Sequence, residues 1–123
     1  MVVNKIVGIG EYIISNQDDD KIITYALASC VAVTVYCPNN KVAGMIHIAL
    51  PEPMDNTNNS SKPGYYAILG LPNFLQIFQT TYYCDKDKMQ IQLFGGANSI
   101  RKNDAFSVGK KNIETIENIL MNN

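Results

Sequence analysis

Two runs of strand-forming residues on either side of Pro-Asn-Asn constrain the fold of this chain most. The first, "CVAVTVYC", spans 30–37 and the second, "KVAGMIHIAL", spans 41–50. Val, Ile, Thr and Tyr dominate both runs, as is typical of β-strands. Asn39 and Asn40 tolerate the positive φ that a tight turn requires. The pattern therefore predicts an antiparallel hairpin with its turn centred on these two residues.

This hairpin predicts which side chains share a face of the sheet. With an even number of loop residues, Cys30 lies opposite Ala49 and His47 lies opposite Ala32, so all four project to one side. Cys30 and His47 are then diagonal neighbours, within reach of an imidazole. A loop of three residues would reverse the face of one partner. We expect an open cavity on the alanine-lined face and the core on the other face, which carries Val31, Val33, Val35, Ile46 and Ile48.

The three cysteines are odd in number and irregularly spaced. Because no secretory signal is evident, a disulfide framework is not expected. The strand parity places Cys37 on the opposite face from Cys30, where it is most simply a small buried hydrophobe. Cys84, next to "DKDK", has no predicted partner. With one histidine and no CxxC motif, the sequence predicts no metal site.

The remaining segments predict an α+β fold. Strands are expected at 4–15, with a Gly-x-Gly interruption, at 21–27 and at 89–97, where Met89, Ile91 and Leu93 face one side. The polar segment 51–64 is expected to be a mobile loop. Strands followed by helix, strand and helix favour an α+β sandwich over a regular βαβ array.

Two helices are expected, at 65–82 and 108–121. A kink or break is predicted near Gly70–Pro72, with Pro72 in the first turn of the longer piece. The inward residues are expected to be Ile68, Leu71, Leu75, Phe78 and Tyr82 in the first helix, and Ile113, Ile116, Ile119 and Leu120 in the second.

Length and charge narrow the function classes. The 123 residues are expected to form a single domain, 1–123. A net charge of −1 and the lack of a basic cluster argue against nucleic acid and acidic membrane surfaces as partners. No run is long and apolar enough to span a bilayer, and no signal peptide is evident. The expected location is the cytoplasm.

Cys30 and His47 leave two interpretations open at this point. One is a buried thiol beside an incidental histidine, and the other is a nucleophile with its base. Ala28 and Ser29, which precede Cys30, lack bulk, so backbone N–H groups near the thiol can approach a reacting carbonyl and stabilise an oxyanion. Their position on one face favours the second interpretation but does not identify a reaction.

Six short motifs, in order, make the chain resemble the CheD family of chemoreceptor glutamine deamidases. They are "VGIGEY" (7–12), "TYALASCVAV" (24–33), "HIALP" (47–51), "KPGYY" (62–66), "FGGA" (94–97) and "VGKKN" (108–112). Ala28 stands where the family usually has glycine. The chain ends at Asn123, whereas typical members continue into further strands, so a short form of the family is expected.

The resemblance implies a layered β/β/α sandwich of the cysteine hydrolase type and catalytic roles for Cys30, His47 and Thr24. The implied reaction converts glutamine side chains on chemoreceptor cytoplasmic helices to glutamate, through a Cys30 thiolate and a His47 imidazolium that Thr24 orients. Ala28 and Ser29 are the expected substrate-binding and oxyanion positions. No cofactor is implied, a CheC-type phosphatase is the usual partner, and a monomer is expected. The alternative is a non-catalytic module that binds receptors or the phosphatase, and transglutaminase-like transfer to an amine is a related possibility.

Overall fold

A computed structural model describes residues 2–53, 60–98 and 107–122 of the chain. The strands are β1 (Val3–Ile6), β2 (Tyr12–Ser15), β3 (Asp20–Ile23), β4 (Val31–Cys37), β5 (Val42–Ile48) and β6 (Gln90–Gly95). The helices are α1 (Ala67–Thr80) and α2 (Val108–Asn122), with short 3-10 turns at Pro38–Asn40 and Lys86–Lys88. Neither helix of the described ranges is both long and apolar enough to cross a membrane.

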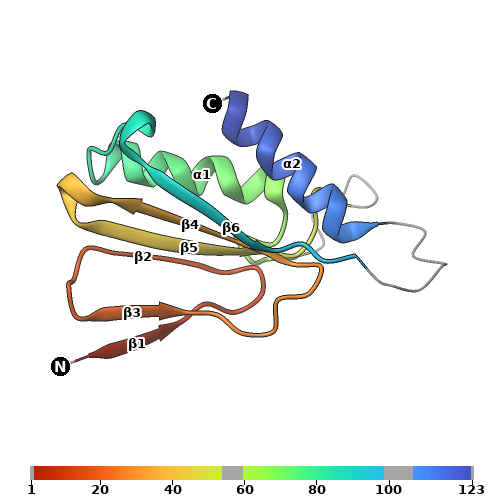
Figure 1. The fold of residues 1–123 in the computed structure, drawn as a ribbon, viewed down its shortest axis with the longest axis horizontal. Helices are drawn as coiled ribbons and strands as arrows, with labels where there is room; N and C mark the ends of the chain where they lie inside the picture. Colours follow the sequence, from red (N-terminus) through yellow and green to blue (C-terminus); the bar gives the residue numbers. More distant parts are fainter. Residues whose placement is uncertain (1, 54–59, 99–106, 123) are drawn as a thin grey trace.

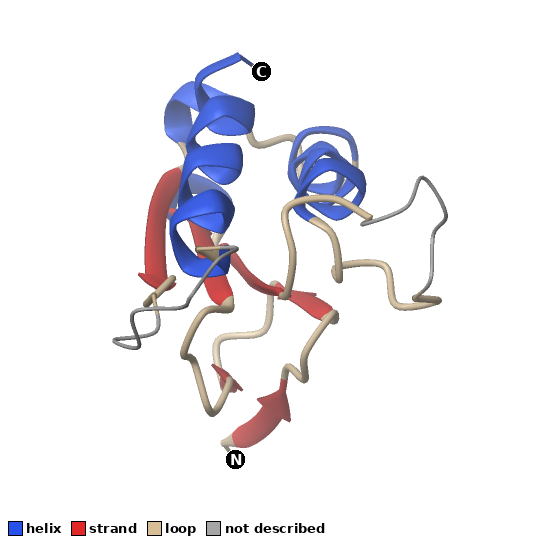
Figure 2. Cartoon of the chain, turned by 90° about the vertical axis from the view of Figure 1, so that its right-hand side faces the viewer, coloured by secondary structure: helices blue, strands red, loops and turns tan. Residues whose placement is uncertain are grey.

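The elements form three layers (Figure 1). The middle layer is an antiparallel sheet with the order β2-β5-β4-β6, and β1 pairs with β3 in a separate parallel pair. Both helices lie on one side of the larger sheet and the β1–β3 pair lies on the other, which the end-on view of Figure 2 also shows. This arrangement confirms the predicted α+β sandwich and its β/β/α layers.

The β4–β5 hairpin has the predicted register. Ala32 lies opposite His47 and Cys37 lies opposite Val42, so four residues make the connection. The prediction of an even loop is therefore correct, but the residue with positive φ is Lys41, at 51°, and not an asparagine. The 3-10 turn at Pro38–Asn40 uses ordinary helical geometry, so only the residue that ends it must adopt the left-handed conformation.

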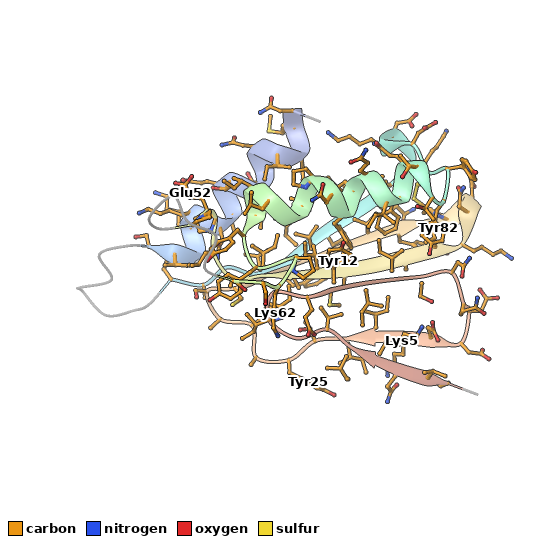
Figure 3. All side chains as sticks on the ribbon, turned by 180° about the vertical axis from the view of Figure 1, so that it is seen from behind. Lys5, Tyr12, Tyr25, Glu52, Lys62 and Tyr82 are labelled. Carbon is orange, nitrogen blue, oxygen red and sulfur yellow. A yellow bond between two sulfur atoms is a disulfide. The ribbon has the colours of Figure 1, made fainter. Side chains whose placement is uncertain are left out.

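The core lies between the larger sheet and the helices, on the face that the valines and isoleucines of β4 and β5 predict. Tyr12 reaches from β2 toward α1 (Figure 3) and its ring meets Phe74 edge-on at 5.5 Å. The predicted inward face of α1 is wrong at Ile68, which is 42% exposed, and it missed Phe74, which is fully buried. The predicted inward faces of β6 and α2 are confirmed, since Ile91, Leu93, Ile113, Ile116, Ile119 and Leu120 all pack in or against the core.

Helix α1 runs through Pro72 without the predicted break. Its first turn is held by tertiary hydrogen bonds, from Ala67 N to Leu50 O and from Ile68 N to Pro51 O. Pro72 therefore removes only one helical bond, the bond to the carbonyl of the solvent-exposed Ile68. Anchoring of the first turn from outside allows the helix to begin before the proline.

The N-terminal strands are shorter and more divided than predicted. Segment 4–15 supplies β1 and β2, which belong to different sheets, because the chain turns at Gly10 with φ of 80°. β3 ends at Ile23, so Thr24 to Leu27 lie in a loop rather than a strand. Of the predicted loop 51–64, residues 54–59 lie outside the described part of the chain.

Cys37 and Cys84 form a disulfide, contrary to the expectation of no disulfide and of no partner for Cys84. Cys37 ends β4 on the core side, and the backbone N–H of Cys84 donates to Phe78 O at the end of α1. The two Cα atoms are 6.4 Å apart, within the range that a disulfide bridges. Sequence spacing gave no hint of this pair because the contact depends on how α1 packs on the sheet.

Candidate active site

Thr24 Oγ1 and His47 Nδ1 lie 2.8 Å apart, and the same hydroxyl donates to Val7 O at 2.7 Å. A threonine hydroxyl has one hydrogen, and a carbonyl oxygen can only accept. The O–H is therefore committed to Val7, so Oγ1 must accept the hydrogen bond from His47 Nδ1. This fixes the neutral tautomer of His47, with the proton on Nδ1 and a lone pair on Nε2.

Nε2 of His47 is buried and has no hydrogen-bond partner among the described residues. The whole side chain is only 1% exposed, and burial lowers the pKa of His47 below its usual value of 6.5. A buried acceptor without a partner costs about 1–3 kcal/mol, so such a group calls for an explanation. A nitrogen kept neutral with a free lone pair is suited to take up a proton.

The backbone of His47 is held by the turn at residues 8–11, which belongs to the "VGIGEY" motif. Gly10 N donates to His47 O at 2.8 Å, and His47 N donates to Glu11 O at 3.0 Å. The carboxylate of Glu11 in turn accepts from Gly8 N at 2.7 Å, and this bond, with Lys62, lowers the pKa of Glu11. The segment 7–11 thus holds the histidine backbone and, through Val7, orients its ring.

Cys30 ends the loop that precedes β4, is half-buried and is not part of the disulfide. The register of β4 continued by one residue places it opposite Ala49, on the same face as His47. Burial raises the pKa of the Cys30 thiol, and its own backbone N–H partly offsets this by lowering the pKa. The raised pKa of the Cys30 thiol and the lowered pKa of the His47 imidazole both favour the neutral pair over the expected thiolate–imidazolium pair.

The carbonyl groups around Cys30 are fixed from behind by the "FGGA" segment. Ala97 N donates to Ala28 O at 2.8 Å, and Gly96 N donates to Cys30 O at 2.9 Å. Gly95, with φ of 93°, passes so close to Cys30 O that a side-chain carbon there would clash with it. Because a trans peptide directs its C=O and the next N–H in opposite directions, the N–H of Ser29 points away from this segment.

Ala28 is exposed, and its φ lies outside the left-handed region, so its methyl group causes no backbone strain. The left-handed residue of this loop is Ala26, with φ of 59°. Alanine in place of the family's usual glycine is therefore compatible with the backbone conformation at position 28.

Among the described residues, Ala32 and Ala49 do not line the predicted open cavity beside Cys30, because they are only 1% and 8% exposed. Small side chains here let the N-terminal segments cover the sheet closely, as the bonds from His47 to the 8–11 turn show. A cavity of about 270 Å³ on this face lies toward the other end of the strands, between Ser15, Asp20 and Met45 among others.

Two residues that contact the site were missed from the sequence. Val7 accepts the Thr24 hydroxyl through its backbone carbonyl, and no side-chain pattern reveals such a role. Asn112 in α2 is fully buried and donates to the carbonyls of Ser29 and Ala49. A polar residue within an otherwise apolar inward helix face was the available signal for Asn112.

Comparison with known proteins places this chain in a family. Residues 49–123 match the family model described as CheD chemotactic sensory transduction. A probable chemoreceptor glutamine deamidase CheD of Syntrophotalea carbinolica is 44% identical over 117 residues, which cover 94% of this chain and 72% of that protein.

Two further relatives agree. A probable chemoreceptor glutamine deamidase CheD 1 of Syntrophus aciditrophicus is 36% identical over 88% of this chain and 68% of its own length. The chemoreceptor glutamine deamidase CheD of Thermotoga maritima is 30% identical over 92% of this chain and 68% of its own length. The matched family model and these relatives show that this chain belongs to the CheD family.

Proposed function

We propose that this protein hydrolyses glutamine side chains of chemoreceptors to glutamate and ammonia, with Cys30 as nucleophile, His47 as general base and Thr24 as the residue that orients the base. The Thr24–His47 hydrogen bond carries the proposal, since it leaves a free lone pair on Nε2 on the face that Cys30 shares. The relatives named as chemoreceptor glutamine deamidases support the substrate class.

The first step begins from the neutral pair. Because the pKa of Cys30 is raised and that of His47 is lowered, Nε2 removes the thiol proton as sulfur attacks the carboxamide carbon, rather than beforehand. A C–S bond forms and the carbonyl electrons move to oxygen. Backbone N–H groups at Ser29 and Cys30 are the proposed donors to that oxyanion, and Ala28 borders it.

The second half of the reaction returns the enzyme to its starting state. His47 delivers its Nε2 proton to the departing nitrogen, the C–N bond breaks, and ammonia leaves a thioester on Cys30. Water then gives a proton to Nε2 and its oxygen attacks the thioester carbon. Collapse breaks the C–S bond, the thiolate regains the proton from His47, and a glutamate carboxyl group is released.

We further propose that residues 1–123 act as one catalytic domain in the cytoplasm. The single domain is supported by the spread of the site, which draws on Val7, Thr24, Cys30, His47 and Asn112, close to both ends of the chain. The cytoplasmic location is supported by membership of the CheD family alone. Cytoplasmic helices of chemoreceptors as substrates, and a CheC-type phosphatase as a competing partner, are supported by membership of the CheD family alone.

Incubation of the protein with chemoreceptor cytoplasmic fragments tests the activity. We expect ammonia release and, by peptide mass spectrometry, conversion of specific glutamines to glutamates. Cys30→Ala should abolish both, and Cys84→Ala is the matched cysteine control that should retain them under conditions where it is folded. Conversion that persists in Cys30→Ala would contradict the proposed nucleophile.

The same fragments separate the alternative functions. Receptor or phosphatase binding that is unchanged by Cys30→Ala, with no ammonia from the unmodified protein, would identify a non-catalytic module instead. Addition of a primary amine and a search for cross-linked product would reveal transfer to an amine in place of hydrolysis.

A further inference from the structure

The side chain of Asn112 joins the two chain segments that carry the candidate nucleophile and base. Its Nδ2 donates to Ser29 O at 2.9 Å and to Ala49 O at 3.1 Å. Ser29 directly precedes Cys30, and Ala49 follows His47 by two residues. One amide group from α2 therefore links the Cys30 loop to the end of β5.

The orientation of this amide is fixed by its surroundings. Both groups that Nδ2 contacts are carbonyl oxygens, which only accept, so exchanging the amide oxygen and nitrogen would set Oδ1 against two acceptors. Asn112 is 0% exposed, and its Oδ1 has no hydrogen-bond partner among the described residues. The fold thus buries a polar side chain of which only the Nδ2 group forms hydrogen bonds with the described residues. This indicates a role for the two hydrogen bonds that Nδ2 donates.

The bond to Ser29 O determines where the backbone N–H of Cys30 points. Ser29 O and Cys30 N belong to the same trans peptide, so fixing the carbonyl toward α2 directs the N–H the opposite way. That N–H lies beside the Cys30 sulfur, where its effect is to lower the thiol pKa. A backbone donor beside the attacking sulfur is suited to stabilise the oxygen that becomes negative in the tetrahedral intermediate.

We propose that Asn112 is a positioning residue for the oxyanion hole, which holds the Ser29–Cys30 peptide plane so that the Cys30 N–H faces the reacting carbonyl, and which ties that plane to the strand of His47. This inference rests on the proposed function for its catalytic readout. The orientation of the Cys30 N–H, however, also changes thiol reactivity, which does not depend on any substrate.

Asn112→Leu tests the proposal, because it keeps the approximate shape and removes both donors. We expect kcat for receptor glutamines to fall on the order of 10- to 100-fold with KM changed less than about 3-fold, since an oxyanion donor acts in the transition state. The pH midpoint for Cys30 alkylation by iodoacetamide should also move upward, because the N–H that favours the thiolate is no longer held.

Ile116→Ala is the matched control, since Ile116 is equally buried, lies one helical turn further along α2 and has an apolar side chain that donates no hydrogen bond to Ser29 O. It should lower the melting temperature while kcat and the alkylation profile stay at their original values well below that temperature. If Asn112→Leu does not fold, Asn112→Ser, which leaves room for water, is measured in the same way.

An unchanged kcat and alkylation profile in a folded Asn112 variant would overturn the proposal, as would an equal loss in Ile116→Ala. If the unmodified protein releases no ammonia, the proposed function fails, but the alkylation profiles still decide whether Asn112 positions the Cys30 peptide.

Discussion

Replacing Thr24 by valine removes the hydroxyl that fixes the His47 tautomer while keeping nearly the same side-chain shape. Oγ1 accepts from His47 Nδ1 at 2.8 Å and donates to Val7 O at 2.7 Å, so the change leaves a donor and an acceptor without their partner. His47 is then free to place its proton on Nε2, where it cannot act as the base. We expect both a catalytic and a stability effect.

The size of both effects follows from the hydrogen bonds lost. A buried polar group without a partner costs about 1–3 kcal/mol. For the His47 bond, this corresponds to a loss in kcat/KM of about 5- to 150-fold, because each 1.4 kcal/mol is tenfold. The bond to Val7 should add a comparable decrease in the free energy of unfolding.

Kinetics on receptor fragments, with urea denaturation in parallel, measure the two effects separately. Thr24→Ser keeps the hydroxyl and should retain most of the activity. Thr34→Val on β4 makes the same chemical change away from the site and should leave kcat/KM unaltered. A folded Thr24→Val variant with the same kcat/KM as the unmodified protein would refute the conclusion that Thr24 sets the tautomer of His47.

Four further outcomes are expected. Folding lowers the pKa of His47, so below pH about 6.5 the unfolded chain binds more protons than the folded chain. The free energy of unfolding should therefore fall as the pH drops through that range. Urea denaturation at a series of pH values should show this fall, and His47→Gln should make it smaller. Thiol titration of the unreduced, denatured protein should find Cys30 alone. Reduction of Cys37–Cys84 should destabilise the fold by up to about 4 kcal/mol for a separation of 47 residues, and an unchanged urea midpoint would argue against the disulfide. Gly95→Ala should displace Cys30 O and lower kcat at least 10-fold, and an unchanged kcat would show that activity does not depend on the position of this carbonyl.

Much of the central sheet was predictable because its signals are local. Alternation of valines with smaller residues, and an even loop, were sufficient to pair Ala32 with His47. The stripe on α2 and the alternation in β6 were equally clear. The errors occurred where tertiary contacts override local preference, as at Pro72, whose helix is anchored in its first turn by Leu50 and Pro51.

The candidate site divides in the same way. Hairpin parity brought Cys30 and His47 to one face, and resemblance to the CheD family added Thr24, but neither indicated that a backbone carbonyl at Val7 sets the tautomer. The expectation of an ion pair was also made without knowledge of burial. Desolvation raises the pKa of the thiol and lowers the pKa of the imidazole, so that both groups favour their neutral forms. How much solvent each group loses depends on the packing of the folded chain.

The sequence by itself determined the pairing of β4 with β5, the shared face of Cys30 and His47 and the family, because these depend on periodicity and on short motifs. The tertiary structure alone decided the protonation of His47, the Cys37–Cys84 bond and the contacts of Asn112 with Ser29 and Ala49. Each of these joins groups that are far apart in the chain, and a hydrogen bond or disulfide forms only when packing brings its atoms to within a few ångströms.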